Sequence, residues 1–381
     1  MDRNAPRRTQ ALAPRVLLYS GGFAPVGGIE TFLSELANCL LDRDFQPRLL
    51  CWGQNSVLMR DLRRRGVPVR RLFWRWGCRW GWPDYALLPL GLREIRLADV
   101  VVMGKVFREP VQMRLGGRRR RWEGPAFVLV TPYRPSELWA RGDEAARVLN
   151  SFDAIVTQSE RFAQDLRDLG YNHIIEVIPY IPPAVVKPRE LPPFPPFRLG
   201  FLGRLEAQKN LCYLLEAFAL IRRRLPVELH LFGDGSEESS LRNTGATIGV
   251  AEHVYLHGRV SREGVAKAVD ECHLFVFSSF SEGQCLAALE ILARGRTIVA
   301  TPVGVFPELL CDRMFGRLAP LGNVQQFAEA IEQQLAGVSQ GGAEPGDVCR
   351  IFARNFPREQ IIDDYVEFFR KAASGFSKCS S

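Results

Sequence analysis

The chain has 381 residues, of which 46% are hydrophobic and 24% are charged. This length suits two domains of roughly 150–200 residues each, and the composition excludes a globally disordered chain. The formal net charge of +8 is uneven, because residues 1–185 hold 28 Lys and Arg against 19 Asp and Glu, whereas the rest holds 22 against 23. The basic first half is either a solvated surface or a face that meets phosphate groups.

Cysteine spacing and hydropathy narrow the class of protein. The nine cysteines are dispersed and include no C-x-x-C pair, which argues against a disulfide framework and a structural zinc site. No run of 18 apolar residues predicts a membrane-spanning helix, and residues 1–15 lack the apolar core of a signal peptide. We therefore expect a cytoplasmic protein without a metal site.

The first half alternates between predicted strands and helices. An apolar strand is predicted at residues 16–19, a glycine-rich turn follows, and apolar residues at helical spacing from Ile29 to Leu40 predict a helix. Further strands are predicted at residues 47–53, 99–103, 127–131, 154–157 and 175–178. This alternation is typical of a doubly wound α/β sheet.

A proline-rich segment, residues 182–197, can form neither a helix nor a central strand and predicts a linker. A second alternating series follows it, with strands predicted at residues 198–205, 227–235, 253–260, 273–279 and 296–304. A glycine-rich spacer near residues 337–346 precedes a predicted last helix at residues 356–372. Ligands of such sheets bind at the carboxyl ends of the strands, so we expect the site in a cleft between two α/β domains.

The loop after the first strand is rich in glycine but fits no nucleotide-binding motif. Gly21, Gly22, Gly27 and Gly28 do not give G-x-G-x-x-G, and the second strand lacks the acidic residue that would bind a ribose. A nicotinamide enzyme is therefore disfavoured, and the chain has no P-loop motif. The loop is either a tight turn or a helix N-terminus that accepts an anion or a sugar hydroxyl.

Two charged pairs in the second half are the strongest candidates for chemistry. Arg204 and Lys209 precede a helix that begins near Asn210, where two cations and the helix dipole attract a diphosphate, unless both simply face solvent. Glu282 and Glu290 have seven residues between them in a small, apolar stretch, SEGQCLAALE, where carboxylates need a partner or a task. The alternative is that Glu282 complements a helix N-terminus and Glu290 lies on the surface.

The segments GRLEAQKN, LHLFGDG, HLFVFSSFSEG, ALEILARGRTIVAT and VGVFPELL occur in this order. Together they resemble the donor-binding domain of GT-B glycosyltransferases, most closely the retaining family-four group (glycosyl transferases group 1). The resemblance covers roughly residues 198–335 and is weaker in the first half, where GGIETFLSELA and FDAIVTQSERFAQDLRDLG still look like family features.

This resemblance implies two Rossmann-like doubly wound α/β domains that face each other across a cleft. We expect an acceptor-binding domain at residues 1–185, a nucleotide-sugar-binding domain at residues 186–355, and a C-terminal helix and tail at residues 356–381 that pack back toward the first domain. The implied activity is a retaining, metal-independent transfer of a hexose from a nucleoside diphosphate sugar, such as a UDP or GDP sugar. The acceptor would be a hydroxyl of a glycan or lipid-linked molecule in polysaccharide or glycolipid biosynthesis, and no cofactor is expected.

The resemblance also implies roles for individual residues. Glu282 would contact the donor sugar, Glu290 would accept hydrogen bonds from the ribose, and Arg204 and Lys209 would bind the diphosphate and stabilise its leaving charge. The implied catalytic residues are Glu282, Arg204 and Lys209. The implied donor-binding residues are Gly28, Gly203, Arg204, Lys209, Glu282, Gly283, Gln284, Cys285, Leu286, Glu290 and Gly304. The implied acceptor or sugar contacts are Gly27, Glu30 and Tyr133. The one D-x-D sequence, at residues 42–44, is expected to be a solvated helix terminus.

The sequence departs from the family pattern at three places. Tyr133 stands where the family has a histidine, and residues 282–286 read E-G-Q-C-L instead of E-G-F-G-L. The paired glycine that precedes the P-E of the family is also changed, to G-V-F-P-E at residues 304–308. Tyr133 in place of the histidine favours an alternative, a non-catalytic glycosyltransferase-like protein that binds a nucleotide or a partner. The retention of Arg204, Lys209, Glu282 and Glu290 argues against this alternative. A nucleotide-sugar epimerase of similar fold lacks supporting catalytic residues here.

The acceptor side is marked by aromatic and basic residues. Residues 70–92 interleave arginines with four tryptophans, and residues 114–122 add a basic run. Such a pattern suits a membrane headgroup interface, stacking on sugars or nucleic-acid bases, or tryptophans packed under an arginine-rich surface. We expect an anionic membrane surface that carries the acceptor, and no nucleic acid.

Overall fold

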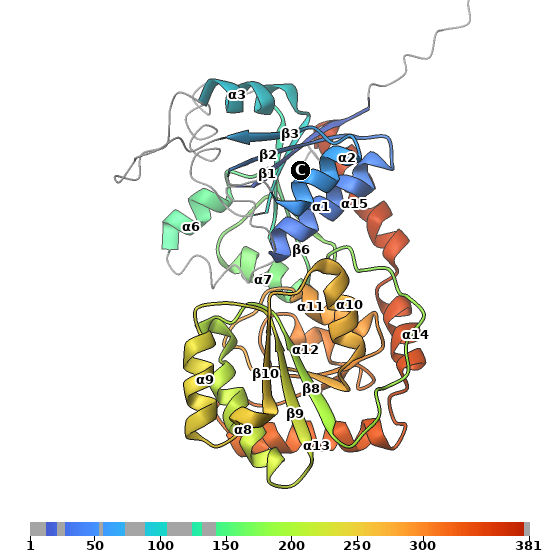
Figure 1. Ribbon diagram of the computed structural model, residues 1–381. Coiled ribbons are helices and arrows are strands. Elements are labelled where there is room, and N and C mark those ends of the chain that lie inside the picture. The colour runs from blue at the N-terminus through green and yellow to red at the C-terminus, as the bar shows by residue number, and fades with distance from the viewer. Residues whose placement is uncertain are drawn as a thin grey trace, which may run out of the picture. The chain divides into compact units, whose positions relative to one another are not determined.

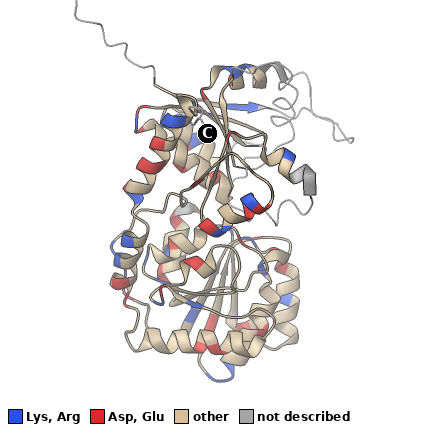
Figure 2. Ribbon diagram, turned by 180° about the vertical axis from the view of Figure 1, so that it is seen from behind, with Lys and Arg blue, Asp and Glu red and all other residues tan. Residues whose placement is uncertain are grey.

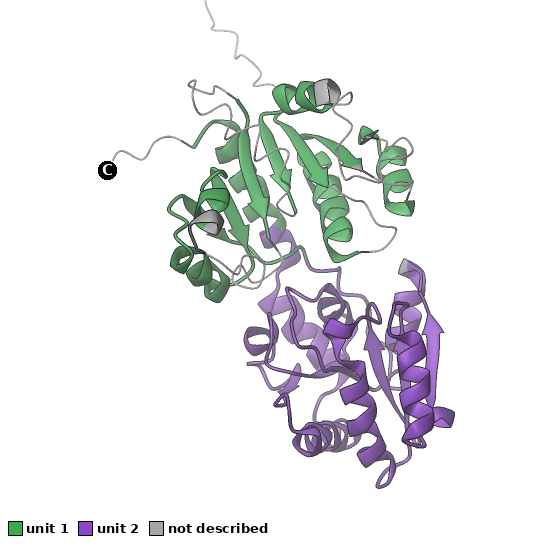
Figure 3. Ribbon diagram, turned by 90° about the vertical axis from the view of Figure 1, so that its left-hand side faces the viewer, with its two compact units in different colours: residues 1–181, 362–381 green, residues 182–361 purple. Residues whose placement is uncertain are grey.

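The computed structural model describes residues 13–20, 27–52, 56–72, 88–104, 124–131 and 142–376. The chain divides into two compact units (Figure 3), unit 1 with Met1–Ile181 and Ile362–Ser381, and unit 2 with Pro182–Ile361. Each unit contains its own parallel sheet. The predicted fold class, two Rossmann-like α/β domains, is confirmed.

Unit 1 is built on a seven-stranded sheet with the order β3-β2-β1-β4-β5-β6-β7 (Figure 1). Its strands are β1 (Arg15–Ser20), β2 (Gln46–Trp52), β3 (Val69–Leu72), β4 (Val100–Met103), β5 (Ala126–Val130), β6 (Ala154–Thr157) and β7 (Ile174–Val177). The central strands are continuous apolar runs because helices cover both faces of a parallel sheet. Val16 and Val101, for example, are completely buried. The strands predicted in this half are all present.

The described helices of unit 1 are α1 (Gly28–Leu41), α2 (Val57–Arg64), α3 (Leu88–Leu97), α6 (Gly142–Leu149) and α7 (Glu160–Asp168). The helix α15 (Arg358–Ala373) begins in unit 2 and ends in unit 1. Its Tyr365 ring lies 5.8 Å from the ring of Phe32 on α1, and its hydroxyl donates to the carbonyl of Ile178 at 3.3 Å. The C-terminal helix is therefore part of the core of unit 1. Among the described residues, no helix has both the length and the apolar character needed to span a bilayer.

Unit 2 contains a six-stranded sheet with the order β10-β9-β8-β11-β12-β13. Its strands are β8 (Phe197–Leu202), β9 (Val227–Phe232), β10 (Val254–Gly258), β11 (Leu274–Phe277), β12 (Thr297–Ala300) and β13 (Gly316–Leu318). Because β8 pairs with both β9 and β11, the strand order reverses beside β8. Such a switch point opens a crevice at the carboxyl ends of the two strands, where ligands of this fold class bind.

The helical elements of unit 2 are η2 (Ala207–Lys209), α8 (Leu211–Arg222), α9 (Glu238–Thr247), η3 (Ala251–His253), α10 (Arg262–Asp270), α11 (Leu286–Leu292), α12 (Phe306–Leu309), α13 (Val324–Ser339) and α14 (Pro345–Asn355). The helix α8 packs against α9 and α13, and α11 packs against α14. The predicted glycine-rich spacer near residues 337–346 was wrong in extent, because Gly337 lies in α13 and Gly346 in α14. Tertiary packing of buried α14 side chains such as Phe352 outweighs the low helix propensity of glycine.

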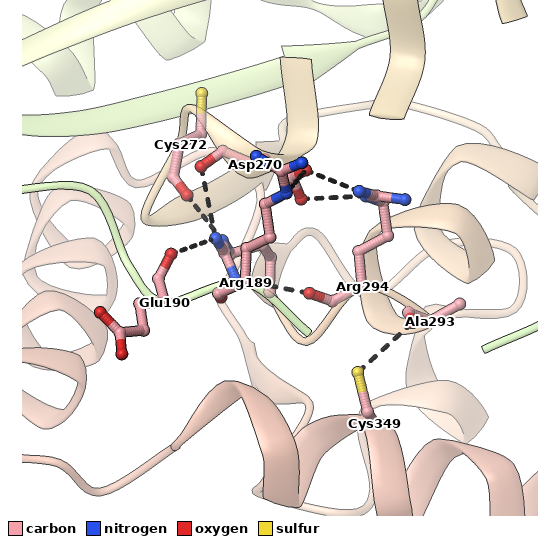
Figure 4. Close-up of polar contacts among 8 residues, drawn as sticks. Arg189, Glu190, Asp270, Cys272, Ala293, Arg294 and Cys349 are labelled. Atoms are coloured by element: carbon pink, nitrogen blue, oxygen red, sulfur yellow. Dashed lines mark hydrogen bonds and ion pairs between the residues drawn. The ribbon is translucent and has the colours of Figure 1, made fainter. Parts of the chain in front are cut away.

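A buried arginine fixes the proline-rich segment to unit 2. Arg296 is completely buried, and its guanidinium donates to the carbonyls of Arg189 and Glu190 in that segment, both at 3.0 Å. It also donates to the carbonyl of Cys272 at 2.9 Å. Figure 4 shows Glu190 and Cys272, with dashed lines at the carbonyl oxygens that accept these hydrogen bonds. The segment is thereby held by side-chain hydrogen bonds in place of regular secondary structure.

Candidate active site

Two neighbouring loops at the carboxyl ends of β8 and β11 carry the three predicted catalytic residues. One follows β8 and holds Arg204 and Lys209, and the other follows β11 and holds Glu282. The loops are joined directly, because the backbone N–H of Phe280 donates to the carbonyl of Gln208 at 2.9 Å. Their proximity follows from the pairing of β8 with β11, which no sequence pattern specifies.

Lys209 and Glu282 form an ion pair in which Nζ lies 2.7 Å from Oε1. The side chains of Lys209 and Glu282 are 17% and 5% exposed, so the ion pair is largely shielded from solvent. Oε1 also accepts a hydrogen bond from the Ser279 hydroxyl at 2.6 Å. Both contacts reach the same oxygen, and an ammonium carries three donors. Nζ and Oε2 therefore keep hydrogen-bonding capacity for a ligand.

The backbone around Lys209 is fixed by a second buried serine. Ser278 is fully buried, and its hydroxyl lies 2.9 Å from the carbonyl of Lys209 and 3.0 Å from that of Asn210. Asn210 has φ of +51°, a left-handed conformation that asparagine tolerates better than most residues. This turn ends η2 and begins α8, and it places the lysine at the edge of the sheet.

The backbone of Glu282 is packed against Gly304, a predicted donor-binding residue. Gly304 has φ of +56°, and a Cβ there would lie 2.4 Å from the carbonyl oxygen of Glu282. The next residue, Val305, donates its N–H to the carbonyl of Gly283 at 3.1 Å. Only glycine meets both the conformational and the steric requirement at position 304.

The start of α11 brings the second glutamate of the pair to the same region. Leu286 is the first residue of α11, and Cys285 before it has φ of +49°, which strains a residue other than glycine. Burial, and to a lesser degree the Glu282 carboxylate, raise the pKa of the Cys285 thiol above its ordinary value. Glu290 acts on this thiol in the same direction and Lys209 in the opposite one. Lys209 and Glu282 are thus in contact beside the start of α11, Glu290 is half-buried one turn further along this helix, and the predicted residue Gln284 is buried before it.

Arg204 is not part of this cluster. Its side chain is 60% exposed, and its guanidinium forms an ion pair with Glu206 two residues along the chain. The structure records no hydrogen bond or ion pair from Arg204 to Lys209 or Glu282 within the described residues. The sequence reasoning missed Glu206 as a partner, although its position close behind Arg204 was the available signal. It also missed Ser278 and Ser279, which precede Glu282 as hydroxyl residues after an apolar strand.

The predicted contacts of the first domain lie in unit 1. Gly27 is the N-cap of α1 and Gly28 its first residue. Glu30 is 8% exposed, and a Cβ on Gly27 would lie 2.1 Å from its Oε2, so this carboxylate lies directly over the glycine. Tyr133 lies outside the described residues, as does most of the aromatic and basic stretch.

The described residues contain no cluster of side chains suited to bind a metal ion. No group of three or more His, Cys, Asp or Glu residues is arranged there to hold a metal ion. Asp42 of the D-x-D sequence caps the C-terminal end of α1 and pairs with Arg65 at 2.6 Å. Its side chain is 57% exposed, in agreement with a solvated helix terminus.

Comparison with known sequences places both units in one family. Residues 26–180 match the model of the family described as Glycosyltransferase Family 4. Residues 196–336 match the model of the family described as Glycosyl transferases group 1. Over 366 residues the chain is 29% identical to the lipopolysaccharide core biosynthesis glycosyltransferase LpsE of Rhizobium meliloti (strain 1021), and the match covers 91% of this chain and 96% of LpsE. It is 27% identical to the D-inositol 3-phosphate glycosyltransferase of Paenarthrobacter aurescens (strain TC1) over 184 residues, which are 47% of this chain and 45% of that protein.

Solved structures share the whole fold. HepE from Anabaena, in complex with UDP-glucose, has a TM-score of 0.74 at 17% identity, with 94% of this chain and 99% of HepE covered. The lipopolysaccharide outer core galactosyltransferase WaaB has a TM-score of 0.65 at 16% identity, with 94% and 98% covered. Since the family matches extend over both units and the fold is common to these structures, the chain belongs to the GT-B glycosyltransferases of the family-four, group 1 type.

Proposed function

We propose that this glycosyltransferase is a retaining, metal-independent enzyme that transfers a hexose from a nucleoside diphosphate sugar. The acceptor is a hydroxyl group of a glycan or lipid-linked molecule in polysaccharide or glycolipid biosynthesis. The observation that carries the proposal is the Lys209–Glu282 pair, 2.7 Å apart at the carboxyl edge of the unit-2 sheet. A cation and a carboxylate in contact present one group for a phosphate and one for a sugar hydroxyl.

The diphosphate binds to the two cations of the first loop. Lys209 uses its remaining donors and keeps its bond to Glu282, because breaking a largely buried pair is costly. Arg204 exchanges Glu206 for a phosphate oxygen, since an exposed ion pair contributes little free energy. As the glycosidic bond breaks, both cations stabilise the charge that develops on the leaving diphosphate. The acceptor oxygen attacks the anomeric carbon on the face that the diphosphate leaves, and a departing phosphate oxygen takes the acceptor proton.

The two glutamates hold the sugar portions of the donor. Oε2 of Glu282 accepts hydrogen bonds from hydroxyls of the hexose, while Oε1 stays bound to Lys209 and Ser279. Glu290, half-buried on α11, accepts from the ribose. Gly304 allows the backbone beside Glu282 to approach the ligand, and Gly27, Glu30 and Tyr133 contact the acceptor or the sugar. A UDP-hexose is the first donor to test, because HepE binds UDP-glucose.

Ligand binding and turnover test this proposal. A thermal-shift screen of UDP, GDP and ADP, each with and without its hexose, identifies the donor, because a ligand of the folded state raises its stability. A nucleotide-release assay then measures turnover, which Lys209→Met and Glu282→Gln are expected to lower by about 10²–10³-fold. Lys267→Met, at a side chain that is 79% exposed on α10, is the matched control and keeps full turnover. Binding without turnover in the native protein would instead support the non-catalytic alternative.

Chelation tests the metal-independent part separately. Full turnover in EDTA is the expected result, because Lys209 and Arg204 supply the positive charge at the diphosphate. Loss of turnover in EDTA that Mg²⁺ or Mn²⁺ restores would contradict it.

The acceptor side of the proposal is a cytoplasmic membrane face that presents a lipid-linked acceptor. Figure 2 shows basic segments on β3 and α3 at the same end of unit 1. Arg60, Arg93 and Arg96 are exposed, and they have no acidic partner among the described residues. Anionic headgroups attract such a surface by about 1 kcal/mol per residue near it. Flotation with anionic but not neutral vesicles is expected, and equal failure with both would remove the membrane from the proposal.

A further inference from the structure

Two adjacent serines, Ser278 and Ser279, directly follow β11, and both are completely buried. Their hydroxyls have different partners: Ser278 donates to backbone carbonyls, whereas Ser279 donates to Oε1 of Glu282 at 2.6 Å. This second distance is in the range of charge-assisted O–H···O⁻ hydrogen bonds, which are about twice as strong as neutral ones. Ser279 is thus the single neutral donor recorded on this carboxylate within the described residues.

A hydrogen bond from Thr301 to the backbone fixes the position of Ser279. Thr301, the first residue after β12, is completely buried and donates its hydroxyl to the carbonyl of Ser279 at 2.7 Å. The N–H of Thr301 is bound to the carbonyl of Phe277 on β11. A chain of contacts therefore runs from the end of β12 through Ser279 to the carboxylate of Glu282.

We propose that Ser279 is a positioning residue for the donor sugar, and this inference rests on the proposed function. Ser279 and Lys209 bind the same oxygen of Glu282 from two loops, which fixes the plane of the carboxylate and directs Oε2 to the hexose. Without the hydroxyl, one contact remains and the carboxylate can rotate about it. Small errors in the geometry of a group that holds the reacting substrate reduce turnover strongly.

A positioning role for Ser279 predicts different effects on the binding of the sugar and on the binding of the nucleotide. Ser279 bonds to Glu282 and not to the side chain of Lys209, so its loss leaves the diphosphate-binding cation in place. Ser279→Ala is expected to bind UDP with the affinity of the native protein. Its kcat should fall by about 10- to 100-fold, and so should its affinity for UDP-glucose relative to its affinity for UDP. A purely structural serine would change both affinities together. If the screen selects another nucleotide, GDP with GDP-mannose or ADP with ADP-glucose replaces this pair.

Thr297→Val is the matched control. Thr297 lies at the other end of β12, is 2% exposed, and its hydroxyl is buried without a hydrogen-bond partner in the described structure. Its replacement removes a buried hydroxyl of similar size without touching Glu282, and it should leave the affinity ratio and kcat unchanged. Equal ratios in Ser279→Ala, Thr297→Val and the native protein would overturn the positioning role while the proposed function stands.

A second variant covers the case in which Ser279→Ala does not fold. Thr301→Val keeps the Ser279 hydroxyl but removes the bond that fixes its carbonyl, so a smaller loss of the same affinity ratio is expected, with unchanged UDP binding. An unchanged ratio in this variant would overturn the inference. A native protein that binds none of the three nucleotide and nucleotide-sugar pairs would contradict the proposed function itself, and the inference with it.

Discussion

We expect unit 2 to lose stability when one partner of the Lys209–Glu282 pair is removed, because the other charge is left buried. Lys209→Met leaves the Glu282 carboxylate, only 5% exposed, with the Ser279 hydroxyl as its remaining partner. Breaking a buried pair costs about 3–5 kcal/mol, and we expect about 3 kcal/mol because the Lys209 side chain is still 17% exposed. Glu282→Gln in the same background removes the stranded charge, so the double variant regains part of this loss. The coupling free energy of the double-mutant cycle is expected at about 1–3 kcal/mol.

A second ion pair of the same loop gives the matched control. The Arg204 and Glu206 side chains are 60% and 36% exposed, so Arg204→Met with Glu206→Gln should give a coupling below about 1 kcal/mol. Urea unfolding followed by far-UV circular dichroism measures both cycles. All seven tryptophans lie in unit 1, so their fluorescence reports that unit alone and shows which transition has moved. A coupling for Lys209 and Glu282 no larger than the control would refute the assignment of a buried, cooperating pair.

Three further predictions follow from buried groups of unit 2. Arg296→Met strands several backbone carbonyls and should lower the free energy of unfolding by at least about 3 kcal/mol in urea titrations; a change below 1 kcal/mol would refute the anchoring role. Gly304→Ala should lower kcat/KM by about tenfold or more, because the added Cβ contacts the carbonyl of Glu282. The control Gly322→Ala, where φ is +88° and no atom lies nearby, should lose only about 1 kcal/mol of stability and no activity. Equal kcat/KM values for the two variants would contradict this prediction. Burial lowers the pKa of His273, whose Nδ1 accepts from a backbone N–H. The folded pKa then lies below the unfolded value, so the stabilisation is present above about pH 6.5 and lost as the pH falls from there toward the folded pKa; the urea midpoint should drop between about pH 7.5 and 5.5, and less so in His273→Gln.

The two cations of the loop that follows β8 differ in how they are neutralised, and this difference bears on the proposed binding of a diphosphate. Lys209 is paired with a buried carboxylate, whereas Arg204 is paired with an exposed one. A phosphate group can replace an exposed carboxylate at low cost, but replacing a buried one would strand its charge. On the proposed function, we therefore expect the donor to add to the Lys209–Glu282 pair and to displace only Glu206.

Much of the architecture was predictable from the sequence. Apolar runs predicted the strands of both sheets except the edge strands β3 and β13, and the 3.6-residue period predicted α1. The proline-rich segment marked the change from one series to the next. Lys209 and Glu282 were predictable as candidates because their motifs are local and follow predicted strands. Glycine content misled the prediction between residues 337 and 346, since it reports propensity and not packing.

Only the tertiary structure brought the candidate residues into contact or kept them apart. Lys209 and Glu282 are 73 positions apart, and they meet because β8 pairs with β11 instead of only with β9. The bonds of Arg296 to the carbonyls of Arg189 and Glu190 likewise join residues more than 100 positions apart, whereas the bond of Ser279 to Glu282 is local. Periodicity describes which face of an element is buried, but not which element covers it. The packing of the whole unit determines which elements become neighbours. It thereby also determined that Lys209 is the partner of the buried Glu282 carboxylate.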